Sequence, residues 1–539
     1  MENIKKLISE VVPSAVIEEK EPLTVTVENK DFRLLAETLR KNDVLSFDYL
    51  NQLIGIDKDE KLGVVYQLSS SEQPGQTIVL HTYADNRENP ELCSVSDLWD
   101  SACINEREAY DFFGIRFIGN PDMRRLFLRN DWKGFPLRKD YVNENEMSVE
   151  SHEMSDISTH FSVVNDKVEE KEENVFENDE YVVNIGPQHP ATHGVLHYRV
   201  ALDGEIVKKV DLNCGYIHRG IEKLSESLAY PQILHFTDRL DYLSAHINRH
   251  ALCLCIEKAG EIEVPERAEY IRVIMDELTR IASHLLGWSC MCMDMGALTA
   301  FIYGMRDREK ILDIFEENCG GRLITNYNVI GGVMQDVHQN FRKQVKEYVN
   351  YQRKKLKEYH AIYTGNVIAR GRMDGVGVLT KEKAISFGIT GPSGRASGFH
   401  CDVRKIAPYS AYKKVKFNEV MRTEGDTFAR YIVRLEEIEE SLNIIEQLVE
   451  SFPDGEYRSK TKPIIKLPEG EYFERVEAAR GEFGVYLASD GNKTPYRLHF
   501  RSPSMALVSV MDTITRGEKI ADFIAIGGSL DYVVPDIDR

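Results

Sequence analysis

The second half of the chain contains the stretch VPERAEYIRVIMDELTRIASHLL, from Val264 to Leu286. Pro265 suits a first helical turn, because the N–H that proline lacks has no partner there. Beyond it, apolar residues recur three or four positions apart and form one stripe: Ile271, Met275, Leu278, Ile281 and Leu285. Such a stripe is typical of an amphipathic helix that packs on a core. The stretch predicts a long, largely buried helix.

Residues 181–539 combine further helical signals with short β signals. A strand is expected at 182–185, followed by a hairpin of 195–202 and 206–212 that the favoured turn Asp203-Gly204 would join. A second helical stripe comprises Tyr431, Leu435, Ile438, Leu442, Ile445 and Leu448. We therefore expect a mainly helical domain with small β-sheets.

Residues 1–141 predict a separate, small α+β domain. The segment LTVTVE (23–28) alternates like a half-buried strand, and 78–83 predicts another. Residues 96–113 predict a helix with Ser96 as its N-cap. A chain of 539 residues exceeds what one hydrophobic core normally supports, so two domains are expected.

The segment 142–180 separates these two domains. It holds 13 acidic residues against two lysines, and it contains neither Gly nor Pro. Because like charges repel and no apolar period is sustained, the segment predicts an extended acidic linker. The alternative is an acidic docking segment for a basic partner.

The charge of the whole chain limits its partners. A net charge of -20 argues against nucleic acid and against an anionic lipid surface. Residues 1–9 lack a secretory pattern, and the most apolar stretch, 285–305, has Asp294 near its middle. We expect a soluble protein that reaches a membrane only through partner subunits.

The cysteines predict no metal centre in this chain. There are nine, no two form C-x-x-C, and each C-x-C pair lies in a helix-like stretch where its side chains diverge. We expect reduced core residues and no iron–sulfur or nickel site. The chain also lacks the glycine-rich fingerprints that bind nucleotides.

The loop GPQHPATHG, residues 186–194, carries two histidines four positions apart. On a helix this spacing could hold zinc, but Pro190 and the flanking glycines indicate a loop. The general alternative is a pair of ordinary polar loop histidines. The loop directly precedes the predicted hairpin, which would place His193 at the end of a strand, where functional residues concentrate.

This loop and the stretches after it resemble the D subunit of respiratory NADH:quinone oxidoreductase (complex I). The resemblance covers essentially all of residues 181–539 in family order. It is carried by GPQHPATHGVL (186–196), GYIHRGIEKL (215–224), DRLDYLSAH (238–246), the helical stretch 264–286, DMGALTAF (294–301), RASGFHCDVRK (395–405), GDTFARYIVRLEEIEESL (425–442), GEFGVYLASDG (481–491) and the closing DIDR.

The first domain is similar to the C subunit of the same complex. The similarity lies in EREAYDFFGIRFIGNPDMRRL (106–126) and WKGFPLRKDY (132–141), although Asn120 and Phe135 stand where that family usually has histidine. In the family this region packs the subunit into the arm of the complex and does no chemistry. The resemblance therefore implies a fusion of C and D subunits.

The D family is related to the large subunit of nickel–iron hydrogenases, which implies a hydrogenase-like fold. Those enzymes hold their metals with two C-x-x-C pairs. At the matching positions this chain has Asp241, Ser244, Val533 and Asp536. Hydrogenase activity is thereby excluded, and the old metal cavity is free for another ligand.

In complex I that ligand is a quinone. The resemblance places His193 and Tyr242 at the two quinone oxygens, with Asp294 as the acidic partner of the histidine and His189 as a further residue of the quinone loop. Two electrons on a quinone require two protons, which an imidazole and a phenol can donate. Taken without the family, Asp294 could equally be a turn or cap residue, and Tyr242 a core residue.

Electrons would come from a 4Fe–4S cluster in a partner subunit. Arg219 and Arg239 match arginines that face this cluster, where positive charge raises its affinity for an electron. Their alternative is an internal salt bridge to Glu222 or Asp241. Ile324 stands where the family commonly has a histidine near the cluster, which predicts that the cluster potential depends only weakly on pH. Asn213 also replaces a family histidine.

The resemblance implies a core subunit in the peripheral arm of a proton-translocating NADH:quinone oxidoreductase. Its expected partners are a cluster-bearing B-type subunit, a ferredoxin-like I-type subunit and an H-type membrane subunit that holds the quinone channel. The expected location is the cytoplasmic side of the bacterial inner membrane. Two alternatives remain: the same quinone-reducing module fed by ferredoxin or another donor, and a scaffold of the arm without catalytic activity.

Overall fold

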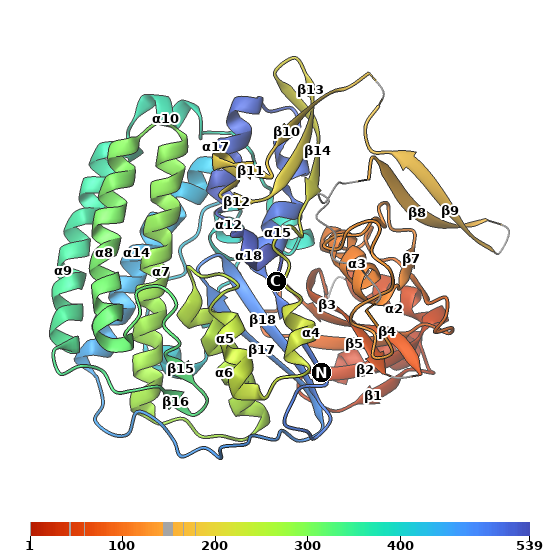
Figure 1. Cartoon of the computed structure of the whole chain (residues 1–539), viewed down its shortest axis with the longest axis horizontal. Coiled ribbons are helices and arrows are strands. Elements are labelled where there is room, and N and C mark those ends of the chain that lie inside the picture. The colour runs from red at the N-terminus through yellow and green to blue at the C-terminus, as the bar shows by residue number, and fades with distance from the viewer. Residues whose placement is uncertain (1, 43–44, 59, 144–154, 165–166, 178) are drawn as a thin grey trace.

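A computed structural model describes residues 2–42, 45–58, 60–143, 155–164, 167–177 and 179–539. The first part of the chain forms a five-stranded sheet with the order β1-β2-β5-β4-β3 (Figure 1). Strands β2 and β5 pair in parallel, and they confirm the two strands predicted from alternation. The elements of this part are α1 (Glu2–Val11), β1 (Val16–Glu18), β2 (Leu23–Glu28), α2 (Asn29–Lys41), β3 (Tyr49–Lys58), β4 (Lys61–Ser69), β5 (Thr77–Tyr83), β6 (Glu91–Cys93), α3 (Asp100–Phe113) and β7 (Arg116–Ile118).

Helix α3 begins later than the sequence indicated. Its first residue is Asp100, so the prediction of Ser96 as N-cap is wrong. The buried carboxylate of Glu106 explains the difference, because it accepts hydrogen bonds from the Ser94 hydroxyl and the Val95 backbone N–H. These bonds hold the preceding residues outside the helix.

The acidic segment contains a hairpin where an extended linker was predicted. Strands β8 (Ile157–Val164) and β9 (Lys167–Asn174) pair in antiparallel fashion and project from the body of the molecule (Figure 1). Phe161 is buried, and its carbonyl accepts a hydrogen bond from the N–H of Gly119 at 3.0 Å. The linker prediction is therefore wrong for 157–174, because Phe161 anchors β8 to the first part while β9 exposes its acidic side chains. Residues 144–154 lie outside the described residues.

Two three-stranded antiparallel sheets lie in the second part, besides two-stranded ones. One has the order β10-β13-β14 and the other β17-β18-β19. The predicted hairpin is present, but Asp203 pairs with Ile206, so its turn is Gly204-Glu205, one residue later than expected. The strands are β10 (Tyr181–Ile185), β13 (His197–Asp203), β14 (Ile206–Asn213), β17 (Gly470–Ala478), β18 (Gly481–Ser489) and β19 (Arg497–Arg501).

Long helices build the core of the second part and stand side by side in Figure 1. Both predicted apolar stripes are buried, one on α7 and one on α14, and this confirms the prediction of a mainly helical domain. The longer helices are α6 (Ala245–Ala259), α7 (Glu266–Asp294), α8 (Leu298–Cys319), α9 (Phe341–Tyr359) and α14 (Thr427–Glu450). Shorter helices used below are α4 (Ile221–Ser225), α5 (Tyr230–Thr237), α10 (Val367–Gly371), α15 (Pro503–Ser509), α17 (Ile520–Leu530) and α18 (Val534–Ile537).

The most apolar stretch, 285–305, is divided between two helices. Helix α7 ends at Asp294 and α8 begins at Leu298. Within the described residues, no helix combines the length and apolar character that a bilayer crossing needs. All nine cysteines are free thiols, as predicted.

The two parts share a buried interface with both apolar and charged contacts. Ile54 and Ile56 of β3 pack in one cluster with Tyr486 of β18. Arg124 of the first part bonds to Asp211 of β14 at 2.7 Å, and both side chains are buried. The α+β architecture thus contains two parts that bury each other's surfaces.

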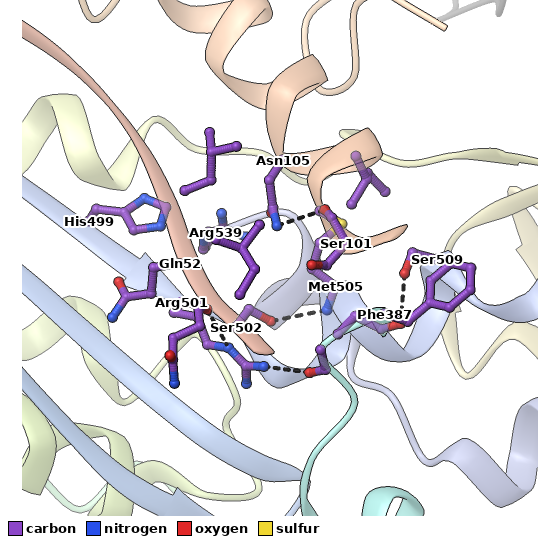
Figure 2. A pocket seen from close by; sticks show the side chains of 16 residues that line it. Gln52, Ser101, Asn105, Phe387, His499, Arg501, Ser502, Met505, Ser509 and Arg539 are labelled. Carbon is purple, nitrogen blue, oxygen red and sulfur yellow. Dashed lines mark hydrogen bonds between the residues drawn. The ribbon is translucent and has the colours of Figure 1, made fainter. Parts of the chain in front are cut away.

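A small polar cavity lies in this interface, between α3 and β3 on one side and β19 and α15 on the other (Figure 2). Beside it, one ligand atom each from Glu108, Glu222 and His499 lie within 4.8 Å of one another. Arg539 bonds to Glu108, and Arg497 bonds to Glu222 at 2.7 Å. Because guanidinium groups already neutralise both carboxylates, this cluster fits an ionic lock between the two parts better than a metal site.

Candidate functional site

The site is built around His193, which ends a tight loop. The loop consists of β11 (Gln188–His189), a 3-10 turn (Pro190–Thr192) and β12 (Gly194–Val195), and it lies beside α17 (Figure 1). The Thr192 hydroxyl lies 2.8 Å from the carbonyls of both His189 and Gly194. His193 adopts φ 52, a left-handed conformation that is uncommon outside glycine and often marks functional positions. The loop therefore fixes the direction of one imidazole.

That imidazole pairs with the carboxylate at the end of helix α7. His193 Nε2 lies 2.8 Å from Asp294 Oδ2, and the two side chains are 23% and 10% exposed. Burial alone would lower the pKa of His193, but the bond to Asp294 and the nearby charge of Asp531 outweigh it and raise the pKa. The carboxylate therefore favours the imidazolium form. The structure brings the predicted pair into contact, and Asp294 is also the last residue of α7, so it combines a helix-end position with the bond to His193.

Tyr242 lies between α5 and α6 and is half-buried. Burial raises the pKa of its phenol, so the proton is held firmly. Among the charged groups near it are Arg480, Asp241 and Asp531. Asp531 also acts on His193, so one carboxylate stands near both the phenol and the imidazole. The two residues predicted from distant stretches thus have one charged neighbour in common, Asp531.

Asp241, one of the positions that the resemblance matched to hydrogenase cysteines, takes part in a buried salt bridge. Arg480 Nη1 lies 2.8 Å from Asp241, and its Nε donates a 2.6 Å hydrogen bond to the carbonyl of Asp531. Asp536 is close as well, since burial and then the charge of Asp241 raise its pKa. A guanidinium group bonded to two aspartates therefore lies in this part of the core.

Arg480 and Asp531 were not predicted as site residues. Asp531 follows α17 with φ 61, and its buried Oδ2 forms no hydrogen bond within the described part of the chain. Each residue is isolated in a different sequence segment, so no spacing or period connects them. The available signal was weak: Asp531 stands two residues before the altered cysteine position Val533.

Arg219 and Arg239 are exposed and lie together. Arg219 Nη2 donates a 3.3 Å hydrogen bond to the carbonyl of Arg239. The alternative of an internal salt bridge is wrong, because Glu222 pairs with Arg497 and Asp241 with Arg480. Burial and the neighbouring charge of Arg239 lower the pKa of Arg219. These two side chains form a cationic patch whose charge no acidic side chain in the described ranges neutralises at salt-bridge distance.

Ile324 and Asn213, which stand where the resembled family has histidines, each have a defined environment in the structure. Ile324 is half-buried in a loop, two residues before Asn326, whose Oδ1 lies 3.1 Å from His235 on the helix that precedes Arg239. Asn213 Nδ2 donates to the Tyr216 hydroxyl at 2.8 Å. Ile324 therefore lies near the cationic patch, and Asn213 serves a local polar contact.

Asn120, Phe135 and His189 make contacts away from the bond between His193 and Asp294. In the first part, Asn120 bonds to the buried Glu106 at 2.7 Å, and the ring of Phe135 lies between the guanidinium groups of Arg125 and Arg138. His189 is exposed on β11 and takes no part in the bond between His193 and Asp294.

Comparisons with known proteins agree with this organisation. The family of the respiratory-chain NADH dehydrogenase 49 kDa subunit matches residues 294–466 and 460–539. The family of the 30 kDa subunit of the same enzyme matches residues 25–146. The two matches lie on the two parts of the chain, in the order that the resemblance predicted.

Curated relatives include fused and separate proteins. The chain is 61% identical over 510 residues to the C/D subunit of NADH-quinone oxidoreductase from Phocaeicola vulgatus, covering 94% of this chain and 98% of the relative. It is 60% identical to the C/D subunit from Bacteroides fragilis over 93% of this chain and 97% of that one. The separate D subunit from Bacillus mycoides is 47% identical over 361 residues, which is 67% of this chain and 99% of that protein. The chain therefore belongs to the family of fused C/D subunits of NADH-quinone oxidoreductase, the core subunits of complex I.

Proposed function

We propose that His193, Asp294 and Tyr242 form the site where the assembled complex reduces a quinone. The observation that carries the proposal is the 2.8 Å bond between His193 and Asp294, in a region where Asp531 acts on both His193 and Tyr242. The curated relatives are named NADH-quinone oxidoreductase subunits, which supports a quinone as the substrate.

The chemistry follows from the two proton donors. A quinone that takes up two electrons becomes a dianion unless two protons arrive, and the donors must face its two oxygens. His193 supplies one proton from an imidazolium that Asp294 stabilises, and Tyr242 supplies the other. Because the pKa of Tyr242 is raised by burial, the phenol gives up its proton only to a strongly basic reduced oxygen. Asp294 orients the imidazole through its 2.8 Å bond to Nε2.

The electrons enter at the cationic patch. Arg219 and Arg239 are exposed and carry charge that a partner's 4Fe–4S cluster, with its anionic thiolate ligands, would neutralise. Positive charge beside the cluster stabilises its reduced form. We infer a cluster-bearing B-type neighbour at this surface, a ferredoxin-like I-type subunit before it in the electron path, and an H-type membrane subunit that guides the quinone, all on the cytoplasmic side of the inner membrane.

Two substitutions test the proposal in the assembled complex. We expect His193→Ala and Tyr242→Phe each to lower NADH-dependent quinone reduction by about a hundred-fold or more, because each removes a proton donor. The matched controls His338→Ala and Tyr181→Phe change a histidine and a tyrosine with exposed positions, and they should retain the activity. If both site variants kept full activity, the chain would act as a scaffold instead.

The electron donor is tested separately. Purification of the complex and identification of its subunits shows whether flavin- and NADH-binding chains accompany this one. Their presence supports NADH as the donor, whereas a ferredoxin-binding subunit in their place would change the donor and keep the quinone chemistry.

A further inference from the structure

Ionisable side chains continue from the proposed quinone site into the core. They lie on α6, α7, α14 and β17, at the residue directly after α17 and in the loop at residue 409, and each is less than 10% exposed. Buried charges cost stability unless each is paired, and such pairs often stabilise a fold less than apolar residues of similar volume. A continuous series of them through a core therefore suggests a role beyond stability. We call the following six residues the interior relay: His250, Tyr409, Glu477, Glu437, His284 and Asp531.

The inner end of the relay is Asp531. Arg434 of α14 lies next to it, with Nε 3.7 Å from Asp531 Oδ2, and the next member of the relay, Glu437, is on the same helix. One turn further along α14, Glu437 accepts from His284 Nε2 at 2.9 Å. Burial lowers the pKa of His284 despite this bond, so a neutral imidazole is favoured there. A neutral imidazole can accept a proton at one nitrogen and release one from the other.

The middle of the relay is Glu477 on β17. Arg395 joins it to Glu437, with bonds of 2.7 Å to Glu477 and 2.8 Å to Glu437. Burial raises the pKa of Glu477 above its ordinary value, against the opposing effect of Arg395. The carboxyl group therefore holds a proton more readily than an exposed glutamate does, which suits a group that takes up and releases protons.

The outer end reaches solvent. The Tyr409 hydroxyl accepts a 3.4 Å hydrogen bond from the Glu477 backbone N–H, and the Tyr409 ring packs edge-on against His250. Neither contact transfers a proton, so buried water has to join Tyr409 to the Glu477 carboxyl group and to His250. His250 Nε2 lies 3.1 Å from the Ser410 hydroxyl. Tyr409 and Ser410 line a groove that is open to solvent between the two parts of the chain. Water in this groove is a source of protons.

Several polar atoms in and beside the relay lack a hydrogen-bond partner among the described residues. The buried His284 Nδ1, Asp276 Oδ1 and Asp531 Oδ2 form no hydrogen bond within the described residues. Buried polar atoms of this kind are usually satisfied by internal water, and such water can connect neighbouring groups. His250 itself is held by Asp276 at 2.6 Å.

We propose that the interior relay, completed by buried water, carries protons from the groove to the quinone site. The inference rests on the proposed function. Each quinone reduced takes two electrons from the partner's cluster and two protons from His193 and Tyr242. The relay returns those two protons from groove water, so both donors regain their starting forms before the next quinone binds.

The test compares Glu477→Gln and His284→Gln with Glu257→Gln in the purified complex. Glutamine at 284 keeps an N–H for Glu437 but cannot pass a proton on. Glu257 is a matched control, because it is a buried glutamate bonded to an arginine, Arg272. It lines the same groove, but among the described residues it bonds to Arg272 and Gly331 and to no member of the interior relay. We expect both relay variants to slow quinone reduction about ten-fold or more and to increase its solvent deuterium isotope effect. The control should stay within about two-fold of the parent for both measurements.

The controls separate the possible failures. Electron transfer from NADH to ferricyanide, which reports the steps before the quinone site, should be equal in all the variants. If His193→Ala is inactive while both relay variants match the parent in rate and isotope effect, the proposed proton path is wrong. The proposal of a quinone site at His193 would still be supported. If His193→Ala and Tyr242→Phe keep their activity, the proposed function fails. Should Glu477→Gln not assemble, His284→Gln and His250→Gln decide between the first two outcomes.

Discussion

The carboxylate of Asp531 lies directly against the backbone of Gly287 on helix α7. A Cβ atom at position 287 would stand 2.8 Å from the Asp531 carboxylate carbon, closer than real Cβ contacts come. Any side chain at 287 must therefore displace a carboxylate that acts on both His193 and Tyr242.

Gly287→Ala is predicted to damage the site more than the fold. The methyl group overpacks the core, which costs about 1–3 kcal/mol of the free energy of unfolding. Quinone reduction should fall by about ten-fold, because Asp531 moves away from the proton donors. Gly371→Ala is the matched control, since that glycine lies in helix α10 with no atom near its missing Cβ. Equal activities of the two variants would contradict the prediction.

Asp294→Asn is predicted to shift the pH dependence of quinone reduction. Asp294 outweighs burial and raises the pKa of His193 above its usual value near ~6.5. The stabilisation from this pair is therefore complete below about pH 6.5 and is lost as the pH rises through the raised pKa. Without the carboxylate, His193 loses its proton at lower pH, so the alkaline limit of activity should move to lower pH. Rates measured from about pH 5.5 to 9 check this, and an unchanged alkaline limit would rule it out.

Arg480→Ala is predicted to be strongly destabilising. The change leaves Asp241 and Asp531 buried without their main cation, which typically costs about 3–5 kcal/mol. The melting temperature of the complex should fall clearly. The control Arg370→Ala removes a half-exposed ion pair with Asp374, one helical turn away, and should change the melting temperature little. Similar melting temperatures for the two variants would show that the buried carboxylates find other partners.

Ile324→His is predicted to make the cluster potential depend on pH. Ile324 lies near the cationic patch and has no titratable group. The cluster potential of the parent complex should therefore change little with pH near neutrality. A histidine there titrates in this range and couples its charge to the electron on the cluster. Redox titrations of the complex at several pH values, followed by electron paramagnetic resonance, measure the slope. A steep slope in the parent would refute the prediction.

The long helices could be predicted from periodicity alone. The stripes of α7 and α14 repeat every three or four residues because one face of each helix is buried, and that face is legible in the sequence. The turn of the β13–β14 hairpin was misplaced by one residue, since Asp203-Gly204 and Gly204-Glu205 both contain the glycine that the turn needs.

The residues of the site are of two kinds: some belong to recognisable sequence motifs, and others come together only in the folded chain. His193, Tyr242 and Asp294 came from stretches that resemble a family, and the structure brings them into one region. Asp531 and Arg480 stand alone in their segments, and only the packing of α7, α17 and β18 brings them to the site. In the acidic segment, charge density concealed the single buried ring of Phe161 that anchors a hairpin.

The buried interface between the two parts also affects how the chain is made. At about 5–20 residues per second, a ribosome needs on the order of 20–80 s to complete the chain after the first part has emerged. For most of that time the sheet face with Ile54 and Ile56 lies uncovered, because Tyr486 is among the last residues to be made. The nascent first part thus exposes an apolar surface that is prone to association. This surface is buried only when the second part of the same polypeptide has been made and packs against it.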